Sequence, residues 1–169
     1  MNPDVFREYD VRGVVDRDLT PDFVYLLGRA IGAYAIRHGV RTMILGRDCR
    51  LSSENYQDAV CRGIRSAGID VTDIGLCATP MLYFATCAYD FDAGVNITAS
   101  HNPKQYNGVK LVAKNAHSIC GNEIQEILKI IQNEDFIEGK GELYSKEIFP
   151  DYLGDIQKKI SLGRKLKVV

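Results

Sequence analysis

The sequence lacks an excess of either charge. Lysine and arginine total 21, aspartate and glutamate total 22, and the net charge is -1. Nucleic-acid-binding proteins carry a surplus of basic residues, so a nucleic-acid partner is disfavoured. The sequence also lacks an apolar run near the roughly 20 residues of a membrane helix, and its N-terminus has neither the basic nor the apolar region of a signal peptide. We therefore expect a soluble, unexported protein that binds neither nucleic acid nor a membrane.

Closely spaced cysteines are lacking too. The five cysteines are odd in number and widely separated, and no C-x-x-C pair occurs. Structural zinc sites and disulfide frameworks use closer or even-numbered sets. The pattern favours buried thiols in a reducing compartment, and we predict a cytoplasmic location.

Several common ligand-binding and hydrolytic motifs are missing. No G-x-G-x-x-G follows a predicted strand, and no G-x-x-x-x-G-K-[ST] is present, which removes the main support for dinucleotide or P-loop binding. Ser100 lies between Ala99 and His101, so it lacks the glycines of a hydrolase G-x-S-x-G turn. With 46% apolar and 25% charged residues, the composition is nevertheless that of an ordinary folded domain.

The hydrophobic periodicity alternates between helix and strand. Thr20 and Pro21 are typical of a helix start, and Ser53 is expected to cap the second helix. The short step from the strand at 93–98 to Asn107 and Gly108 predicts a hairpin with an antiparallel edge strand. The fold class is therefore α/β, a three-layer α/β/α domain with a mixed sheet and helices on both faces. Helices are predicted at 20–39, 53–68, 79–89, 124–131 and 149–160, and strands at 41–46, 69–75, 93–98 and 109–113.

Residues 165–169 have the apolar pattern of a strand that begins and is not completed. At 169 residues the chain has the usual length of one domain. The unfinished strand instead indicates that more sequence belongs downstream.

Four polar segments, at 6–13, 46–53, 98–103 and 106–110, are candidates for a site. Ser100 follows an apolar strand, where ligands of α/β sheets gather, although a plain turn residue is the alternative. His101 would point away from Ser100 in extended chain, so a direct pair needs a sharp turn; a loop imidazole bonded to backbone is the alternative. For 46–53 the alternative to a site is a strand-to-helix turn in which Asp48 pairs with an arginine.

Together with A-T-P at 78–80, these segments resemble the α-D-phosphohexomutases. The residues F-R-E-Y-D-V-R-G at 6–13, L-G-R-D-C-R at 45–50, T-A-S-H-N-P at 98–103 and Y-N-G-V-K at 106–110 keep that family's order and spacing. The serine segment is most similar to the phosphomannomutase/phosphoglucomutase branch.

The resemblance implies a four-domain enzyme that interconverts hexose 1-phosphate and hexose 6-phosphate of mannose or glucose. Residues 1–146 correspond to its first domain, and 147–169 to the start of the second. The family's D-G-D-x-D-R metal loop, sugar-recognition loop and distal phosphate loop have no counterpart here. The resemblance thus implies that the phosphorylated hexose is the substrate, that three further domains are needed, and that the chain alone is inactive.

The resemblance also implies a role for individual residues. Ser100 corresponds to the phosphoserine that gives and receives the phosphoryl group. Arg12 is expected to clamp its phosphate, and Lys110 to act as general acid/base or electrostatic partner of the attacking hydroxyl. His101 belongs with these catalytic residues and helps to shape the loop.

Substrate and metal contacts follow from the same resemblance. Tyr9 is expected to line the substrate cleft, and Asn102 to bind substrate while shaping the loop. Mg²⁺ is expected to bind through the phosphate on Ser100, with its other ligands missing from this chain. A hexose 1,6-bisphosphate is the expected activator.

A second hypothesis from another class remains open. The chain could be a non-catalytic binding or assembly module, derived from the same domain and pairing with a partner protein. Its oligomeric state and a mutase assay distinguish the two.

Overall fold

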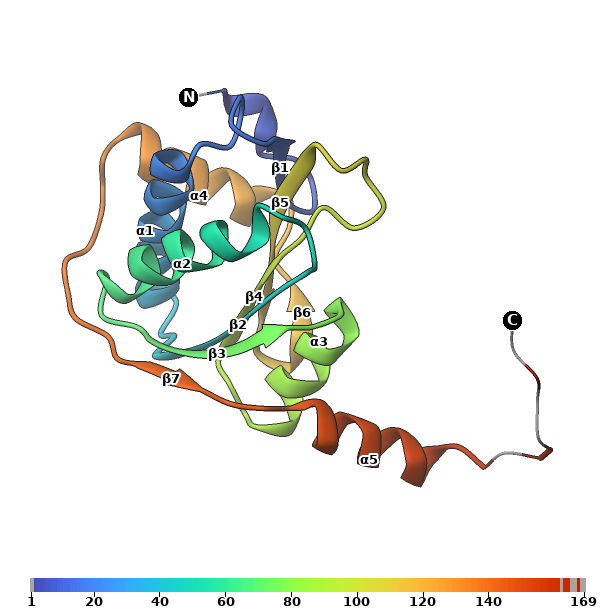
Figure 1. Cartoon of the computed structure of the whole chain (residues 1–169). Coiled ribbons are helices and arrows are strands. Elements are labelled where there is room, and N and C mark those ends of the chain that lie inside the picture. The colour runs from blue at the N-terminus through green and yellow to red at the C-terminus, as the bar shows by residue number, and fades with distance from the viewer. Residues whose placement is uncertain (1, 162, 165–166, 168–169) are drawn as a thin grey trace.

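The computed structural model describes residues 2–161, 163–164 and 167. The strand expected at 165–169 therefore lies, except for Lys167, outside the described residues. All five predicted helices are present, and each begins within two residues of its expected start (Figure 1). The helices are α1 (Pro21–Arg37), α2 (Ser53–Arg65), α3 (Thr79–Ala88), α4 (Asn122–Gln132) and α5 (Phe149–Lys159), and the strands are β1 (Val11–Val14), β2 (Thr42–Arg47), β3 (Asp70–Leu76), β4 (Ala93–Ile97), β5 (Tyr106–Ala113), β6 (His117–Ser118) and β7 (Leu143–Ser145).

The seven strands form one mixed sheet in the order β1-β5-β4-β2-β3-β7, with β6 paired to β5. β2 pairs in parallel with both β3 and β4, and β3 pairs in parallel with β7. β5 is antiparallel to β4, as expected, but it is not an edge strand, because β1 and β6 pair with its other side. The expectation of an edge was wrong because the partner, β1, lies about a hundred residues earlier in the chain.

The start of β5 also differs from the prediction. Asn107 and Gly108 lie inside the strand, which begins at Tyr106, and residues 98–105 form the connection. Gly108 is opposite Arg12 of β1, and a Cβ at Gly108 would lie 2.4 Å from the Val11 carbonyl oxygen. The glycine is therefore required by close strand packing rather than by a hairpin turn.

Helices cover both faces of the sheet, which confirms the three-layer α/β/α fold (Figure 1). Successive residues of a strand point to opposite faces, so the two faces build separate apolar clusters. Met43 and Leu45 of β2 belong to the large cluster under α1, α2 and α4. Ile44 between them belongs to a smaller cluster with Leu82 and Ala85 of α3.

The start of α1 is as predicted, whereas that of α2 is not. Thr20 is the N-cap of α1, and its Oγ1 accepts a hydrogen bond from the Phe23 N–H at 3.2 Å. In α2 the N-cap is Ser52, without a side-chain cap, and Ser53 is the first helical residue. The Ser53 hydroxyl is used elsewhere, in the site described below.

The chain after α4 ends in β7 and α5. β7 was not predicted, because its three residues are all exposed and show no alternation. Ile148 is buried in the α3 cluster, but no residue of α5 itself is buried. Within the described part of the chain, every helix is too short or too polar to span a bilayer.

Candidate active site

Ser100 lies in the serine loop, residues 98–105, which joins β4 to β5 at the carboxyl end of β4 (Figure 1). Its backbone is left-handed, with φ of 54°, and the residue is exposed. The Ser100 N–H donates to Thr98 Oγ1 at 2.9 Å, and the Asn102 N–H donates to the Ala99 carbonyl oxygen at 3.0 Å. These bonds turn the chain sharply and leave Ser100 on the outside of the turn.

The sharp turn brings Ser100 and His101 together. Ser100 Oγ lies 3.4 Å from His101 Nδ1. Neighbouring side chains diverge only while the chain stays extended, and the left-handed conformation at Ser100 ends that alternation. The sharp turn that a Ser100–His101 pair requires is therefore present, and the contact between the two exposed residues is long.

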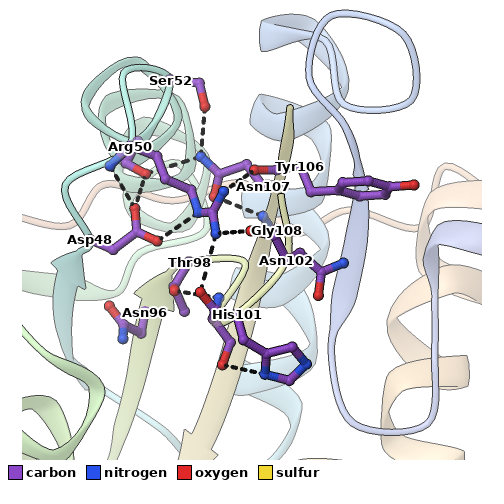
Figure 2. Close-up of polar contacts among 12 residues, drawn as sticks. Asp48, Arg50, Ser52, Asn96, Thr98, His101, Asn102, Tyr106, Asn107 and Gly108 are labelled. Atoms are coloured by element: carbon purple, nitrogen blue, oxygen red, sulfur yellow. Dashed lines mark hydrogen bonds and ion pairs between the residues drawn. The ribbon is translucent and has the colours of Figure 1, made fainter. Parts of the chain in front are cut away.

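Arg50 contacts the backbone of the serine loop, as Figure 2 shows. Its Nη1 donates to the carbonyl oxygens of Pro103, at 2.9 Å, and Tyr106, at 3.1 Å. Its Nη2 donates to the carbonyl oxygens of Ser100, at 3.1 Å, and Asn102, at 2.6 Å. One guanidinium thus binds backbone carbonyl oxygens from Ser100 to Tyr106, the first residue of β5.

Asp48 holds that guanidinium in an ion pair, as expected for the alternative in which residues 46–53 form a strand-to-helix turn. Its Oδ2 accepts from Arg50 Nε at 3.1 Å, while Oδ1 accepts from the Ser53 hydroxyl at 2.6 Å and the Arg50 N–H at 3.0 Å. Burial alone would raise the pKa of the Asp48 carboxyl, but the hydrogen bonds from Ser53 and the Arg50 N–H outweigh it. The pKa therefore lies below its usual range, and the carboxylate stays charged at neutral pH.

Asn107 ties the start of β5 to the start of α2. The residue is buried, and its Nδ2 donates to the hydroxyls of Ser52, at 2.8 Å, and Ser53, at 3.0 Å (Figure 2). Its Oδ1 accepts from the Gly108 N–H at 2.8 Å. The β5 end of the serine loop is therefore fixed to the start of α2.

Arg12 and Lys110 share one buried carboxylate. Asp10 Oδ2 accepts from Arg12 Nη2 at 2.5 Å and from Lys110 Nζ at 3.3 Å. The Arg12 side chain is 9% exposed and also donates from Nη1 to Asn102 Oδ1 at 2.6 Å. Its Nε is buried and has no partner among the described residues. Arg12 is thus joined to the serine loop, and Lys110 is joined to Arg12 through Asp10.

The structure brings five of the six predicted site residues into one connected group. Tyr9 is the exception: it precedes Asp10 in the chain, but its side chain is 67% exposed and forms no hydrogen bond within the described residues. Nothing in this arrangement tests its expected place at the substrate. The group consists of Ser100, His101, Asn102, Arg12 and Lys110.

Sequence reasoning missed the residues that hold this group in place. Asp10 and Arg50 lie inside the segments singled out at 6–13 and 46–53, so their motifs were the available signal. Their roles depend on contacts with residues 50 to 100 positions away, which no local pattern contains. Asn107 was read as a turn residue for the same reason.

The described residues do not by themselves form a magnesium site. No group of three or more histidine, cysteine, aspartate or glutamate side chains suited to a metal is found in the described residues. The carboxylates near the loop are already paired, Asp10 with Arg12 and Lys110, and Asp48 with Arg50. The described residues alone therefore do not fit a Mg²⁺ ion, whose remaining oxygen ligands would have to come from outside them.

Comparison with known proteins identifies the fold and the motifs. Residues 3–138 match the family model described as phosphoglucomutase/phosphomannomutase, alpha/beta/alpha domain I. The chain is 41% identical to the phosphoglucomutase of Neisseria meningitidis serogroup A, and 36% identical to the phosphomannomutase/phosphoglucomutase of Pseudomonas aeruginosa, over 98% of its length in each case. A phosphoglucomutase/phosphomannomutase family protein of Burkholderia thailandensis superposes with a TM-score of 0.91 at 33% identity, over 97% of this chain and 37% of that one.

The match covers only part of those relatives. The chain spans 36% of the length of the Neisseria protein and 35% of the Pseudomonas protein. Within that span the family model coincides with strands β1 to β6, helices α1 to α4 and the serine loop. The chain therefore belongs to the phosphoglucomutase/phosphomannomutase family and contains its alpha/beta/alpha domain I.

Proposed function

We propose that this chain is the phosphoserine-bearing first domain of a phosphohexomutase that interconverts hexose 1-phosphate and hexose 6-phosphate of mannose or glucose. The main observation in support of this proposal is that Ser100 is exposed and lies on a loop that Arg12 and Arg50 both contact. A phosphoryl group adds about -1.5 to -2 charges, which cationic neighbours must offset. Arg12 and Lys110 supply two positive charges against the single carboxylate of Asp10.

The proposed reaction conserves its phosphoryl groups. A hydroxyl oxygen of the hexose phosphate bonds to phosphorus as the bond from phosphorus to Ser100 Oγ breaks, and the hydroxyl proton passes to a base. Lys110 serves there as the acid/base group or as electrostatic partner of the hydroxyl. The hexose bisphosphate so formed returns its other phosphoryl group to Ser100 Oγ, which leaves the isomeric monophosphate and a phosphoserine.

The remaining residues support that chemistry. Arg12 is assigned to bind the serine phosphate, and its hydrogen bond to Asn102 in the same loop supports this role. His101 Nδ1, near Ser100 Oγ, helps to orient the loop, and Asn102 and Tyr9 are assigned to the substrate side. Hexose 1,6-bisphosphate is the proposed activator, since it can phosphorylate Ser100 Oγ and leave as a hexose monophosphate. Mg²⁺ on the phosphoserine would offset charge, its other ligands being supplied by the rest of the enzyme.

We further propose that residues 1–146 are the first domain, that 147–169 begin the second, and that three more domains complete the enzyme. The family match ends at residue 138, and no residue of α5 is buried. Without the other domains the chain alone is expected to be inactive as a mutase. The free thiols support a cytoplasmic location.

Phosphorylation of Ser100 tests the proposal. We expect the chain, treated with glucose 1,6-bisphosphate, to gain one phosphoryl group by intact mass and to show a phosphoserine signal by ³¹P NMR. Ser100→Ala should remove both, whereas Ser118→Ala, which changes an exposed serine of β6, should change neither.

A chimaera keeps the test decisive if the chain alone resists phosphorylation. Residues 1–146 would replace the aligned part of the Neisseria phosphoglucomutase, and glucose 1-phosphate turnover would be measured. Activity that depends on Ser100 supports the proposal. An inactive but folded chimaera, or phosphorylation at another residue, contradicts it and favours the non-catalytic assembly module.

A further inference from the structure

The Arg50 guanidinium is fully used by contacts inside the chain. Its Nε donates to Asp48, and its two terminal nitrogens donate to the four loop carbonyl oxygens described above. A guanidinium has five N–H donors in a fixed planar arrangement, so these five bonds leave none for a ligand. Arg50 therefore acts on the backbone of the serine loop rather than on a substrate.

These bonds set the direction of the peptide group that follows Ser100. The Ser100 carbonyl oxygen points to Arg50 Nη2, and the peptide bond is trans. In a trans peptide the N–H points opposite to the C=O, so the His101 N–H is directed away from Arg50. That N–H forms no hydrogen bond within the described residues. Backbone N–H groups beside a left-handed residue form concave sites that bind anions.

We propose that Arg50 is a positioning residue for Ser100. By holding the Ser100 carbonyl oxygen, it fixes the left-handed turn and directs the His101 N–H toward a phosphoryl group on Ser100 Oγ. The inference rests on the proposed function, because that function supplies the phosphoryl group. It goes beyond that function by giving a structural cause for the orientation of the phosphoserine.

Asp48 makes this arrangement rigid. The carboxylate is itself held by the Ser53 hydroxyl and by the Arg50 N–H, so the guanidinium is bonded on both its Nε edge and its terminal nitrogens. Lysine keeps the positive charge but has three donors on one nitrogen, and it cannot reach four carbonyl oxygens and a carboxylate together. Arg50→Lys therefore removes the planar arrangement of five donors and keeps the positive charge.

Proteolysis tests whether Arg50 holds the loop. Lys104 is exposed in the serine loop and offers a trypsin site. In the folded chain we expect cleavage after Lys104 to be about tenfold faster, or more, in Arg50→Lys and Arg50→Ala, because the loop opens locally. The matched control is Arg62→Ala, which breaks an exposed Arg–Asp pair of α2 and should leave the rate unchanged. Melting temperatures, measured in parallel, separate local opening from loss of the fold.

Chemical rescue adds a control against general damage. Free guanidinium ion, at concentrations that leave the melting temperature unchanged, should slow the cleavage of Arg50→Ala, and ammonium ion should not. Equal cleavage rates in the unsubstituted chain and both Arg50 variants would overturn the proposal.

Two readouts test the link to Ser100. On phosphorylation, the amide proton of His101 should shift downfield in the unsubstituted chain and stay nearly in place in Arg50→Lys. In the Neisseria chimaera, Arg50→Lys should lower kcat about a hundredfold, the scale expected for a misplaced reacting group, and leave KM nearly unchanged. A rise in KM alone, or an unchanged kcat, contradicts a positioning role.

The outcomes separate this inference from the proposed function. If Ser100 is phosphorylated at the same rate with and without Arg50, the positioning role is overturned and the proposed function still stands. The opposite outcome is that the loop opens in the Arg50 variants but Ser100 is never phosphorylated, even in the chimaera. That result would overturn the proposed function and the assigned role of the His101 N–H. The hold of Arg50 on the loop would then still stand.

Discussion

At the scale of single residues, the cysteines differ sharply in their exposure. Cys49 and Cys87 are exposed, whereas Cys61 and Cys77 are buried, and burial raises the pKa of each of the two buried thiols to about 11. Only the thiolate reacts quickly with alkylating reagents. At pH 8 about one in a thousand of the buried thiols is ionised, compared with roughly a quarter for an ordinary cysteine.

We therefore expect iodoacetamide at pH 8 to modify Cys49 and Cys87 first, with partly buried Cys120 reacting more slowly. Peptide mass mapping over time measures the order. Cys61 and Cys77 should react only after denaturant is added, which serves as the control for reagent access. Rapid labelling of Cys77 in the folded chain would contradict the packing of that thiol against β2.

The site residues show how far a motif can be read. Ser100, Arg12 and Lys110 were assigned to a site because they lie in motifs that resemble those of the phosphohexomutases. Asp10 was not, although its carboxylate is what joins Arg12 to Lys110. For Arg50 the sequence predicted no more than that an arginine pairs with Asp48, because hydrogen bonds to distant carbonyl oxygens leave no mark on the local pattern.

At the scale of elements, the close contact of α1 with α2 depends on glycine. A Cβ added at Gly63 would lie 2.4 Å from the Tyr25 carbonyl oxygen and 2.7 Å from the Arg29 nitrogen. Both atoms belong to the backbone of α1, so neither can move without shifting the helix. The helices pack backbone to backbone here.

Gly63→Ala should accordingly lower the free energy of unfolding by about 1–3 kcal/mol through overpacking, although alanine is the better helix former. Gly154→Ala is the matched control, since no atom lies within 4 Å of a Cβ at that position in α5. That control should raise stability by up to about 1 kcal/mol. Urea unfolding of both variants gives the comparison, and equal effects of the same sign would contradict the packing argument.

The helices and the central strands were predictable, and the edge strands were not. Each helix was predicted from an apolar stripe that is local in sequence, and α1 also has a local start signal in Thr20 and Pro21. β1 has four residues in a polar segment, and β7 has three exposed residues. Their strand conformation comes from pairing with β5 and β3, which are far away in the chain.

At the scale of the whole molecule, α5 packs on the surface against α3 and has no buried residue of its own. Its contacts with α3 include the rings of Phe84 and Tyr152, 5.4 Å apart, and a hydrogen bond from the Tyr89 hydroxyl to Asp151. Its apolar side chains Phe149 and Leu153 stay exposed, as does Ile160 directly after it. Ile148, just before it, is 2% exposed and belongs to the α3 cluster. The packing thus predicts that residues 1–148, the proposed first domain extended by two residues to include Ile148, fold without α5.

A chain truncated after Ile148 should therefore unfold in one cooperative transition. We expect its free energy of unfolding to fall by about 1–2 kcal/mol, because an aromatic pair contributes about 0.5–1.5 kcal/mol and an exposed hydrogen bond adds little. A chain truncated after Lys140 is the control: it also loses β7, buried Gly141 and Ile148, and should lose several kcal/mol. Circular dichroism in urea measures the unfolding of both chains. If the chain truncated after Ile148 no longer unfolded cooperatively, α5 would be part of the first domain and the domain boundary would lie beyond residue 159.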